Sequence, residues 1–499
     1  MKWAVVVVAL GLTAVGSAGA ADRLGTSLGD LIIGTRGADE VAAGAGADRI
    51  LVWGDNRRDR VGCGSGLDLV NAELNDVLGA SCETVARQIS RDRTAADSGA
   101  QKGTQAEPDS VAVGDTIVTV FQSGRYRDGG AAAVGFSTSH DAGASWREGT
   151  LPRPAEYERN TDPVVAYDAT RGTWLAATLG LSNSGGTALL VSRSTDGLVW
   201  DEPVVAAADT DPDGGLDKEW VVCDNGVESS FRGRCYLAAS DLTFSSIQVQ
   251  NSPDGGVTWS QPVYPLRTSP QGALGAFPVV RPNGDLIVFL LDGTEGPRAF
   301  RSTDGGARLF PVEGVFGGEN ADIKGVRASE LIAADADASG RVIAVWAECG
   351  LRATCDGNDV VLTESRDGVT WSPRRRLPTQ ATGTAFMPTV AIDPRSGRIG
   401  VLYYAATGCN QRCRVDVWLL ESFDGRSWTQ PVRLSAQSME LPWIARSNQG
   451  AMLGDYVSLS YTRGRPLAVL ALAQKPVGGR LRQATFAVTA VAPALRIIR

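Results

Sequence analysis

A turn motif that recurs six times is the feature of this sequence that most constrains its fold. Its clearest copy is Ser252-Pro253-Asp254-Gly255-Gly256-Val257-Thr258-Trp259. The serine and aspartate side chains can bond the backbone amides of a tight turn, and glycine supplies a positive φ. The aspartates of the six copies lie 50 to 63 residues apart: Asp141, Asp196, Asp254, Asp304, Asp367 and Asp424. A period of about four short strands predicts radially repeated sheets, which is the architecture of a β-propeller.

Short apolar segments between these turns predict an all-β fold, because they alternate with turn residues and show no helical period. Seven segments are predicted as the first strands of blades: Val111–Val113, Val164–Tyr167, Val221–Cys223, Val279–Val280, Leu331–Ala333, Thr389–Ile392 and Val457–Leu459. Seven first strands beside six turn motifs favour a seven-bladed propeller. Six blades are the alternative, in which an end segment completes a shared blade.

The six turns resemble the Asp-box, or bacterial neuraminidase repeat, of the sialidase superfamily. The resemblance covers roughly residues 108–495 of the predicted propeller, which spans residues 108–499. In that family the Asp-box is a structural turn away from the active-site face. The resemblance therefore implies a propeller fold and a glycan-directed function, either hydrolysis or recognition of a complex or acidic carbohydrate.

The resemblance to sialidases also implies a set of site residues. They hold the substrate carboxylate with three arginines, attack with a tyrosine paired to a glutamate, and use an aspartate as acid/base. Arg159 and Arg327 are candidates for two of the arginines, and Tyr404 or Tyr456 for the tyrosine. The pattern places no third arginine. An exo-sialidase-like glycoside hydrolase is thus one expectation, and a non-enzymatic extracellular binding or scaffold propeller is the other.

Loops that enter the first strands of a propeller converge at one end of its central channel, so residues there are the candidate site. Asp217 and Glu219 are predicted to do acid/base work, together with Tyr456 as a catalytic residue. The predicted substrate-binding residues are Arg159, Asp162, Lys218, Trp220, Arg327, Glu330 and Asp455. The single histidine, His140, lies inside a turn motif. This placement argues against Ser-His-Asp chemistry and leaves carboxylates, tyrosine, lysine and arginine, the side chains of glycoside hydrolysis.

The N-terminal part divides into three segments. Residues 1–20 combine Lys2, an apolar stretch and a small-residue site ending at Ala20, which predicts a secretory signal peptide cleaved near Ala20 and a secreted protein. Residues 21–87 have a shorter repeat, and residues 88–107 lack apolar periodicity and are predicted to be a linker. No later apolar run is long enough to predict a membrane span.

Residues 21–87 repeat an Asp-x-apolar triplet, at Asp30, Asp39, Asp48, Asp59, Asp68 and Asp76. The glycine-rich segments around Asp48 and Asp68 resemble the hemolysin-type (RTX) calcium-binding repeat in a degenerate form. This resemblance implies a small β-roll or β-solenoid whose aspartates bind calcium. The other interpretation is a metal-free solenoid held by its core and by a disulfide between Cys63 and Cys82.

Eight cysteines fall into four local pairs: Cys63/Cys82, Cys223/Cys235, Cys349/Cys355 and Cys409/Cys413. An even number of locally paired cysteines in an exported chain predicts four disulfides rather than metal thiolates. The formal net charge is −8, with 56 acidic residues against 48 basic ones. We therefore expect a monomer with a carbohydrate or extracellular protein ligand and no affinity for nucleic acid. Only five of the 48 basic residues are lysine, a bias that suggests a GC-rich bacterial genome.

Overall fold

The computed structural model describes residues 21–94, 99–211, 215–265, 272–292, 296–313, 317–328, 330–380, 382–490 and 497–498. The predicted signal peptide lies outside these residues. Apart from one 3-10 turn, η1 (Leu441–Trp443), the regular structure of the described residues is β-strand. The prediction of an all-β chain is confirmed. None of the described segments forms a helix long and apolar enough to cross a membrane.

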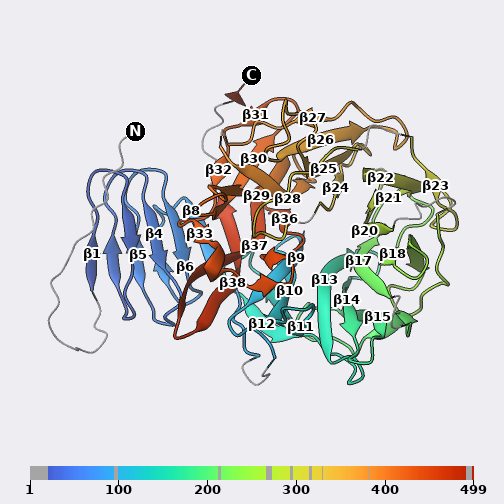
Figure 1. Ribbon diagram of the computed structural model, residues 1–499, viewed down its shortest axis with the longest axis horizontal. Helices are drawn as coiled ribbons and strands as arrows, with labels where there is room; N and C mark the ends of the chain where they lie inside the picture. Colours follow the sequence, from blue (N-terminus) through green and yellow to red (C-terminus); the bar gives the residue numbers. More distant parts are fainter. Residues whose placement is uncertain are drawn as a thin grey trace.

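The N-terminal unit is a solenoid of short parallel strands (Figure 1). One face is formed by β1 (Asp22–Leu24), β3 (Glu40–Ala42), β5 (Arg60–Gly62) and β7 (Val77–Leu78), and the other by β2 (Leu31–Ile33), β4 (Arg49–Val52), β6 (Leu69–Ala72) and β8 (Thr84–Gln88). One apolar side chain from most strands fills the thin core, among them Ile32, Val41, Ile50, Val61 and Val70. These are the apolar residues two positions after each aspartate, as the repeat predicts.

The rest of the chain forms antiparallel sheets arranged in a ring (Figure 1). The first sheet contains β9 (Gln105–Val113), β10 (Thr116–Arg125), β11 (Ala131–Ser139) and β12 (Arg147–Thr150), and a single pair, Ala131 with Asn160, joins it to the second. The second contains β13 (Arg159–Asp168), β14 (Thr173–Leu181), β15 (Thr187–Ser194) and β16 (Val204–Asp209). The third contains β17 (Leu216–Cys223), β18 (Cys235–Asp241) and β19 (Ser246–Ser252), and the fourth β20 (Ala273–Val280), β21 (Leu286–Asp292), β22 (Gly296–Ser302) and β23 (Phe310–Pro311).

The ring continues through three more sheets. The fifth sheet contains β24 (Ala333–Ala336), β25 (Val342–Glu348), β26 (Asp359–Ser365) and β27 (Arg375–Arg376). The sixth contains β28 (Thr384–Ile392), β29 (Ile399–Thr407), β30 (Arg414–Ser422), β31 (Trp428–Thr429), β32 (Val432–Arg433), β33 (Met439–Glu440) and β39 (Ile497–Ile498). The last contains β36 (Ser458–Thr462), β37 (Arg465–Val477) and β38 (Arg480–Ala490). A separate hairpin is formed by β34 (Arg446–Ser447) and β35 (Gly450–Ala451). The first strand of each sheet contacts the first strand of the next, and β36 returns to β9.

The repeated turns have the hydrogen bonds that their sequence predicts. In the copy at residues 252–259, Ser252 Oγ donates to Asp254 Oδ1 and accepts from Gly256 N, at 2.8 Å each. Asp254 Oδ1 also accepts from Thr258 N at 2.9 Å. Gly255 and Gly256 have φ angles of 74° and 87°, which explains the glycine in this position. These bonds hold the pKa of Asp254 below its usual range although partial burial alone would raise it.

The solenoid and the ring share one continuous sheet. β8 pairs antiparallel with β38, from Thr84 with Ala490 to Gln88 with Phe486. The resulting order is β2-β4-β6-β8-β38-β37-β36. On the same seam the rings of Trp53 and Phe486 meet edge to face with centroids 4.7 Å apart. The last strand of the solenoid is therefore also the outer strand of the last sheet of the ring.

The segment expected to be a linker is short in the structure. β8 ends at Gln88 and β9 begins at Gln105. The start of β9 is polar yet buried, because Gln105 Nε2 donates to Ser90 Oγ at 2.6 Å and Gln105 Oε1 accepts from Thr485 N at 2.9 Å. Because these buried side chains are polar and satisfied by hydrogen bonds, the segment lacks the alternating apolar residues from which a strand is predicted. The start of β9 therefore could not be predicted from the sequence.

The cysteine pairing is confirmed. Disulfides join Cys63 to Cys82, Cys223 to Cys235, Cys349 to Cys355 and Cys409 to Cys413. Each closes a local loop, with a sequence separation of at most 19 between the partners.

Candidate functional site

A bulge recurs at the same place in the first strands of the ring. In five of these strands a residue near the N-terminal end has a positive φ: Glu107 (50°), Asp162 (48°), Lys218 (52°), Gly275 (73°) and Met387 (53°). The pairing register with the second strand shifts at each of these positions. Such a bulge re-aims one side chain without ending the strand. Left-handed backbone is unfavourable for residues other than glycine, and strained positions of this kind concentrate at functional sites.

The bulges bring charged side chains from distant segments together. Lys218 Nζ lies 2.5 Å from Asp455 Oδ2, 3.1 Å from Asp162 Oδ1 and 3.7 Å from Glu107 Oε1. Arg327 pairs with Asp455 through two nitrogens. We call Glu107, Asp162, Asp217, Lys218, Arg327 and Asp455 the central cluster. The Lys218 side chain is only 8 % exposed. Its ammonium charge therefore interacts with the three carboxylates in surroundings that contain little water.

Burial and ion pairing push the cluster's pKa values in opposite directions. Burial would raise the pKa of Asp162, but the charge of Lys218 outweighs it and holds that pKa below its usual range. Asp455 behaves in the same way, because both Lys218 and Arg327 oppose the effect of burial on its pKa. For Glu107 burial dominates over Lys218 and raises the pKa to about 8. The cluster therefore contains ionised and protonated carboxyls side by side at neutral pH.

Asp217 is the cluster carboxyl that combines a raised pKa with partial exposure. Its pKa is raised to about 7, first by burial and then by the charge of Asp162 and a hydrogen bond with it, while Lys218 opposes the shift. The side chain also accepts from the backbone N of Lys218 at 3.0 Å. A carboxyl that exchanges its proton near pH 7 beside an ionised one is the arrangement of acid/base pairs.

Glu219 has different surroundings. It is 1 % exposed, and in the described part of the chain neither of its carboxyl oxygens has a hydrogen-bond partner. Burial raises its pKa well above the usual value. The adjacent cavity has a volume of about 30 Å³ and is lined mainly by apolar side chains, including Phe277, Ile332 and Met387. This space admits water but no sugar ring.

The predicted aromatic residues pack on one another beside this cavity. The Trp220 ring lies 4.3 Å from that of Phe277 and 5.2 Å from that of Tyr456, centroid to centroid. Tyr456 is buried, its hydroxyl donates to the carbonyl of Pro163 at 2.9 Å, and burial raises its pKa well above the usual value. In this arrangement its proton is held by the backbone.

Two of the predicted binding residues stand apart from the contacts of the cluster. Arg159 Nη1 pairs with Asp128 at 2.9 Å, and its guanidinium lies 4.1 Å from the centre of the Tyr126 ring. Glu330 is exposed, and among the described residues it has no ion pair. Tyr404, the other candidate tyrosine, is buried and donates to the carbonyl of Ala471 at 2.9 Å.

The structure adds three residues that sequence reasoning missed. Glu107 lies at the end of the expected linker, and Gln122 Nε2 donates to both Glu107 and Thr161. Arg125 donates to Gln122 Oε1 at 2.8 Å and is 2 % exposed. Arg125 is thus a second buried arginine near the cluster. Its one signal in the sequence is its place at the end of a second strand.

The six solenoid aspartates form two ladders along the stack. Asp30 N donates to Asp48 Oδ1 and Asp48 N to Asp68 Oδ1, each at 2.8 Å. On the other side Asp39 N donates to Asp59 Oδ1 at 2.7 Å and Asp59 N to Asp76 Oδ1 at 2.9 Å. Asp30 Oδ2, both oxygens of Asp39 and Asp76 Oδ2 accept further hydrogen bonds, but Asp48 Oδ2 and Asp68 Oδ2 are buried without a partner in the described residues. Burial raises the pKa of Asp48 to about 6.

Comparison with known proteins gives structural neighbours only. No protein-family model matches the chain, and no curated protein matches it. Among solved structures, it is similar to the Hadza microbial sialidase Hz136, at 18 % identity over 64 % of this chain and 66 % of the sialidase, with a TM-score of 0.46. It is also similar to the GH93 α-L-arabinofuranosidase of Fusarium graminearum, at 13 % identity over 81 % of this chain and 96 % of that one, with a TM-score of 0.45. A third neighbour is the leech intramolecular trans-sialidase, at 12 % identity over 64 % and 67 % of the two chains and a TM-score of 0.43. The function of the chain therefore has to be inferred from its own side chains.

Proposed function

We propose that this is a secreted, monomeric β-propeller protein of sialidase type that acts on carbohydrate at the central cluster. The observation that supports this function is the convergence of Glu107, Asp162, Lys218, Arg327 and Asp455 from segments far apart in sequence. Solvent reaches this cluster at Arg327, whose side chain is 21 % exposed, and at the half-buried Asp217. Paired carboxyls with separated pKa values are the machinery of glycoside hydrolysis.

In this proposal the fold is a solenoid at residues 21–87 followed by a propeller at residues 108–499. We infer seven blades, because seven first strands contact one another around the ring and β8 supplies the outer strand of the last sheet. The six-bladed alternative would need one of these first strands to lie outside the ring.

We assign Asp217 as the proton donor and the ionised Asp162 as its partner carboxylate. Of the two acid/base carboxyls predicted from sequence, Asp217 is the more accessible, since Glu219 is enclosed beside Trp220, Phe277 and Tyr456. Arg327, which is partly exposed, is the contact for an anionic group on the substrate.

Turnover of a panel of aryl glycosides, including a sialoside and an α-L-arabinofuranoside, tests this function. In Asp217→Asn we expect kcat/KM to fall by about 10²–10⁴, the usual contribution of a positioned general acid. Because Asp217 donates its proton only when protonated, activity of the unchanged protein should fall as the pH rises through about 7. Asp201→Asn, at an exposed aspartate, is the matched control and should retain full activity. Unchanged turnover in Asp217→Asn would remove Asp217 from the mechanism.

A non-enzymatic binding or scaffold role is the second candidate. It is favoured by the small volume of the cavity at Glu219, about 30 Å³, and by the ion pairs that occupy the cluster's charges. Under this alternative the protein would turn over no substrate in the panel, whereas glycan or protein binding would persist in Asp217→Asn.

Calcium binding by the solenoid aspartates is a separate proposal. The buried, unpartnered oxygens Asp48 Oδ2 and Asp68 Oδ2 are the donors that would hold the ion, since carboxylate oxygens are the ligands that calcium prefers. Calorimetric titration of the intact protein with calcium is expected to give saturable heat that is lost in the double variant Asp48→Asn/Asp68→Asn. The absence of heat at millimolar calcium would leave the aspartates with a purely structural role in the ladders.

A further inference from the structure

A groove lies between the solenoid and the β37–β38 hairpin, away from the central cluster. It has a volume of about 560 Å³, and its walls come from both units: residues 33–36, 51–55 and 57 on one side and residues 474, 477 and 480–482 on the other. Figure 1 shows the two parts side by side, with β37 and β38 next to the solenoid strands. The size is in the usual range for ligand sites.

The groove is strongly positive although the protein as a whole is acidic. Four arginines line it, Arg36, Arg57, Arg480 and Arg482, against a single carboxylate, Asp55. Among the described residues, none of the four arginines forms an ion pair within 4.0 Å. Arg480 and Arg482 each donate to a backbone carbonyl, of Asp92 at 3.1 Å and of Trp53 at 2.9 Å. Asp55 and the buried Glu73 act on the charge of Arg482 without forming an ion pair with it.

A buried donor without a partner lines the same groove. Trp53 is 6 % exposed, and its indole Nε1 has no hydrogen-bond partner in the described part of the chain. A buried N–H without an acceptor is costly and uncommon in folded proteins. Because this N–H is enclosed, it is not open to a ligand in the groove.

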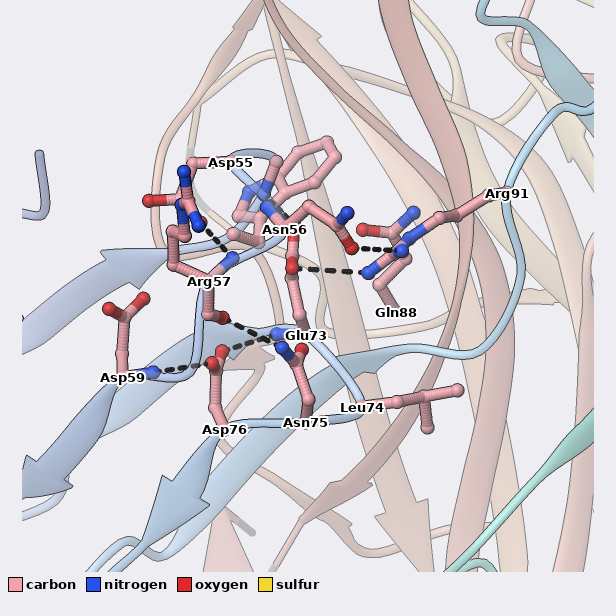
Figure 2. Close-up of polar contacts among 12 residues, drawn as sticks. Asp55, Asn56, Arg57, Asp59, Glu73, Leu74, Asn75, Asp76, Gln88 and Arg91 are labelled. Carbon is pink, nitrogen blue, oxygen red and sulfur yellow. Dashed lines mark hydrogen bonds and ion pairs between the residues drawn. The ribbon is translucent and has the colours of Figure 1, made fainter. Parts of the chain in front are cut away.

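The loop that carries Trp53 and Arg57 is held in place before any ligand binds. Glu73, 1 % exposed, accepts from the backbone N of Gly54 at 2.5 Å and of Asn56 at 3.1 Å, and Arg91 Nη2 donates to its other oxygen at 3.2 Å. Figure 2 shows Glu73 below Asn56 of this loop, with Arg91 reaching it from the side. Gly54 has a φ of 92°, which favours glycine, and a Cβ there would displace the end of the Arg482 side chain, 1.6 Å away. A rigid loop lowers the entropy cost of binding.

We propose that this groove binds an acidic polysaccharide through its carboxylate or sulfate groups. Guanidinium groups donate paired hydrogen bonds to such oxoanions. The ligand extends along the groove, so several of its charged sugars meet the four arginines. This binding is independent of the central cluster and does not rest on the proposed catalysis.

The aromatic surroundings favour a carbohydrate over a single-stranded nucleic acid. Nucleic-acid grooves offer exposed aromatic faces on which bases stack. Here Trp53 is buried, with Phe486 against its ring at 4.7 Å and the Arg482 guanidinium 5.5 Å from its ring centre. No base can reach that ring face.

The experiment is calorimetric titration of the intact protein with oligogalacturonate and with dextran sulfate, using neutral dextran as the uncharged probe. We expect saturable binding of at least one polyanion, weakened by added salt, and no binding of neutral dextran. The double variant Arg36→Gln/Arg57→Gln should lose at least about tenfold in affinity, since each charge-assisted bond accounts for about that factor.

Matched variants distinguish the groove from general surface charge. Arg58→Gln/Arg60→Gln changes the net charge equally at exposed positions of the same segment that do not line the groove, and it should bind as the unchanged protein does. Asp217→Asn, in the central cluster, should also bind normally. Failure of both polyanions to bind, an equal loss in the Arg58/Arg60 pair, or equal affinity for a single-stranded oligonucleotide would each overturn the proposal.

Discussion

Replacing Lys218 by methionine is expected to lower the free energy of unfolding at pH 7 by about 3–5 kcal/mol. The ammonium group is 8 % exposed and faces Asp162, Asp455 and Glu107, at 3.1, 2.5 and 3.7 Å. Without it these carboxyls remain buried with Arg327 as the nearest cation and like charges close together. Removing one partner of a buried ion pair is costly because the other charge is left uncompensated.

The destabilisation caused by Lys218→Met should depend on pH, and the direction of this dependence follows from the pKa of Asp162. In the unchanged protein Lys218 holds the pKa of Asp162 below its usual value of 3.8, so its stabilising effect is present above that pH and is lost as the pH falls through the lowered pKa. The difference in the free energy of unfolding between the variant and the unchanged protein should therefore become smaller as the pH falls below about 4. Urea denaturation at several pH values measures this difference. Lys475→Met, at an exposed lysine on β37, is the control and should cost less than about 0.5 kcal/mol. A loss at Lys218 no greater than in the control would mean that the cluster's charges are solvated.

Phe486→Ala is the second change with a large expected effect, a loss of about 3–5 kcal/mol. Phe486 is fully buried in β38, pairs in register with Gln88 of β8, and meets the Trp53 ring at 4.7 Å. Its removal opens a cavity at the seam between the solenoid and the ring. The loss should appear as a lower midpoint in urea and as faster proteolysis of the solenoid.

Phe310→Ala provides the comparison for this prediction. Phe310 is 46 % exposed, so its truncation should cost less than about 1 kcal/mol and leave the solenoid protected. If Phe486→Ala destabilised the ring while the solenoid kept its resistance to protease, the two units would fold independently and the shared sheet would not couple them.

The sequence predicts the local features of this protein well. The repeated turns form because serine, aspartate and glycine satisfy their own backbone, as at Ser252, Asp254 and Gly256. The disulfides were predictable because their partners are close in sequence, and the solenoid because each Asp-x-apolar triplet fills one position of a stacked turn. Interactions of this kind depend on residues within a few positions or one repeat of each other.

The candidate site was predicted only in part. The rule that loops entering first strands converge correctly brought Asp162, Lys218, Arg327 and Asp455 together. It gave no reason to separate Arg159, which instead pairs with Asp128, and it missed Glu107 and Arg125. Glu107 is an isolated polar residue in a segment without period, and only the positive φ of its bulge turns it toward Lys218.

What the sequence by itself determined is thus the all-β chain, its repeats and its covalent links, all of which follow from short-range patterns. Tertiary structure alone decided the charge of the two candidate sites. The pKa values of Asp217 and Asp162 separate because burial and the ammonium of Lys218 act on them unequally, and both effects depend on three-dimensional distance. Arg36, Arg57, Arg480 and Arg482 form no cluster along the chain, and they share one groove because β8 pairs with β38 and brings the two ends of the protein together.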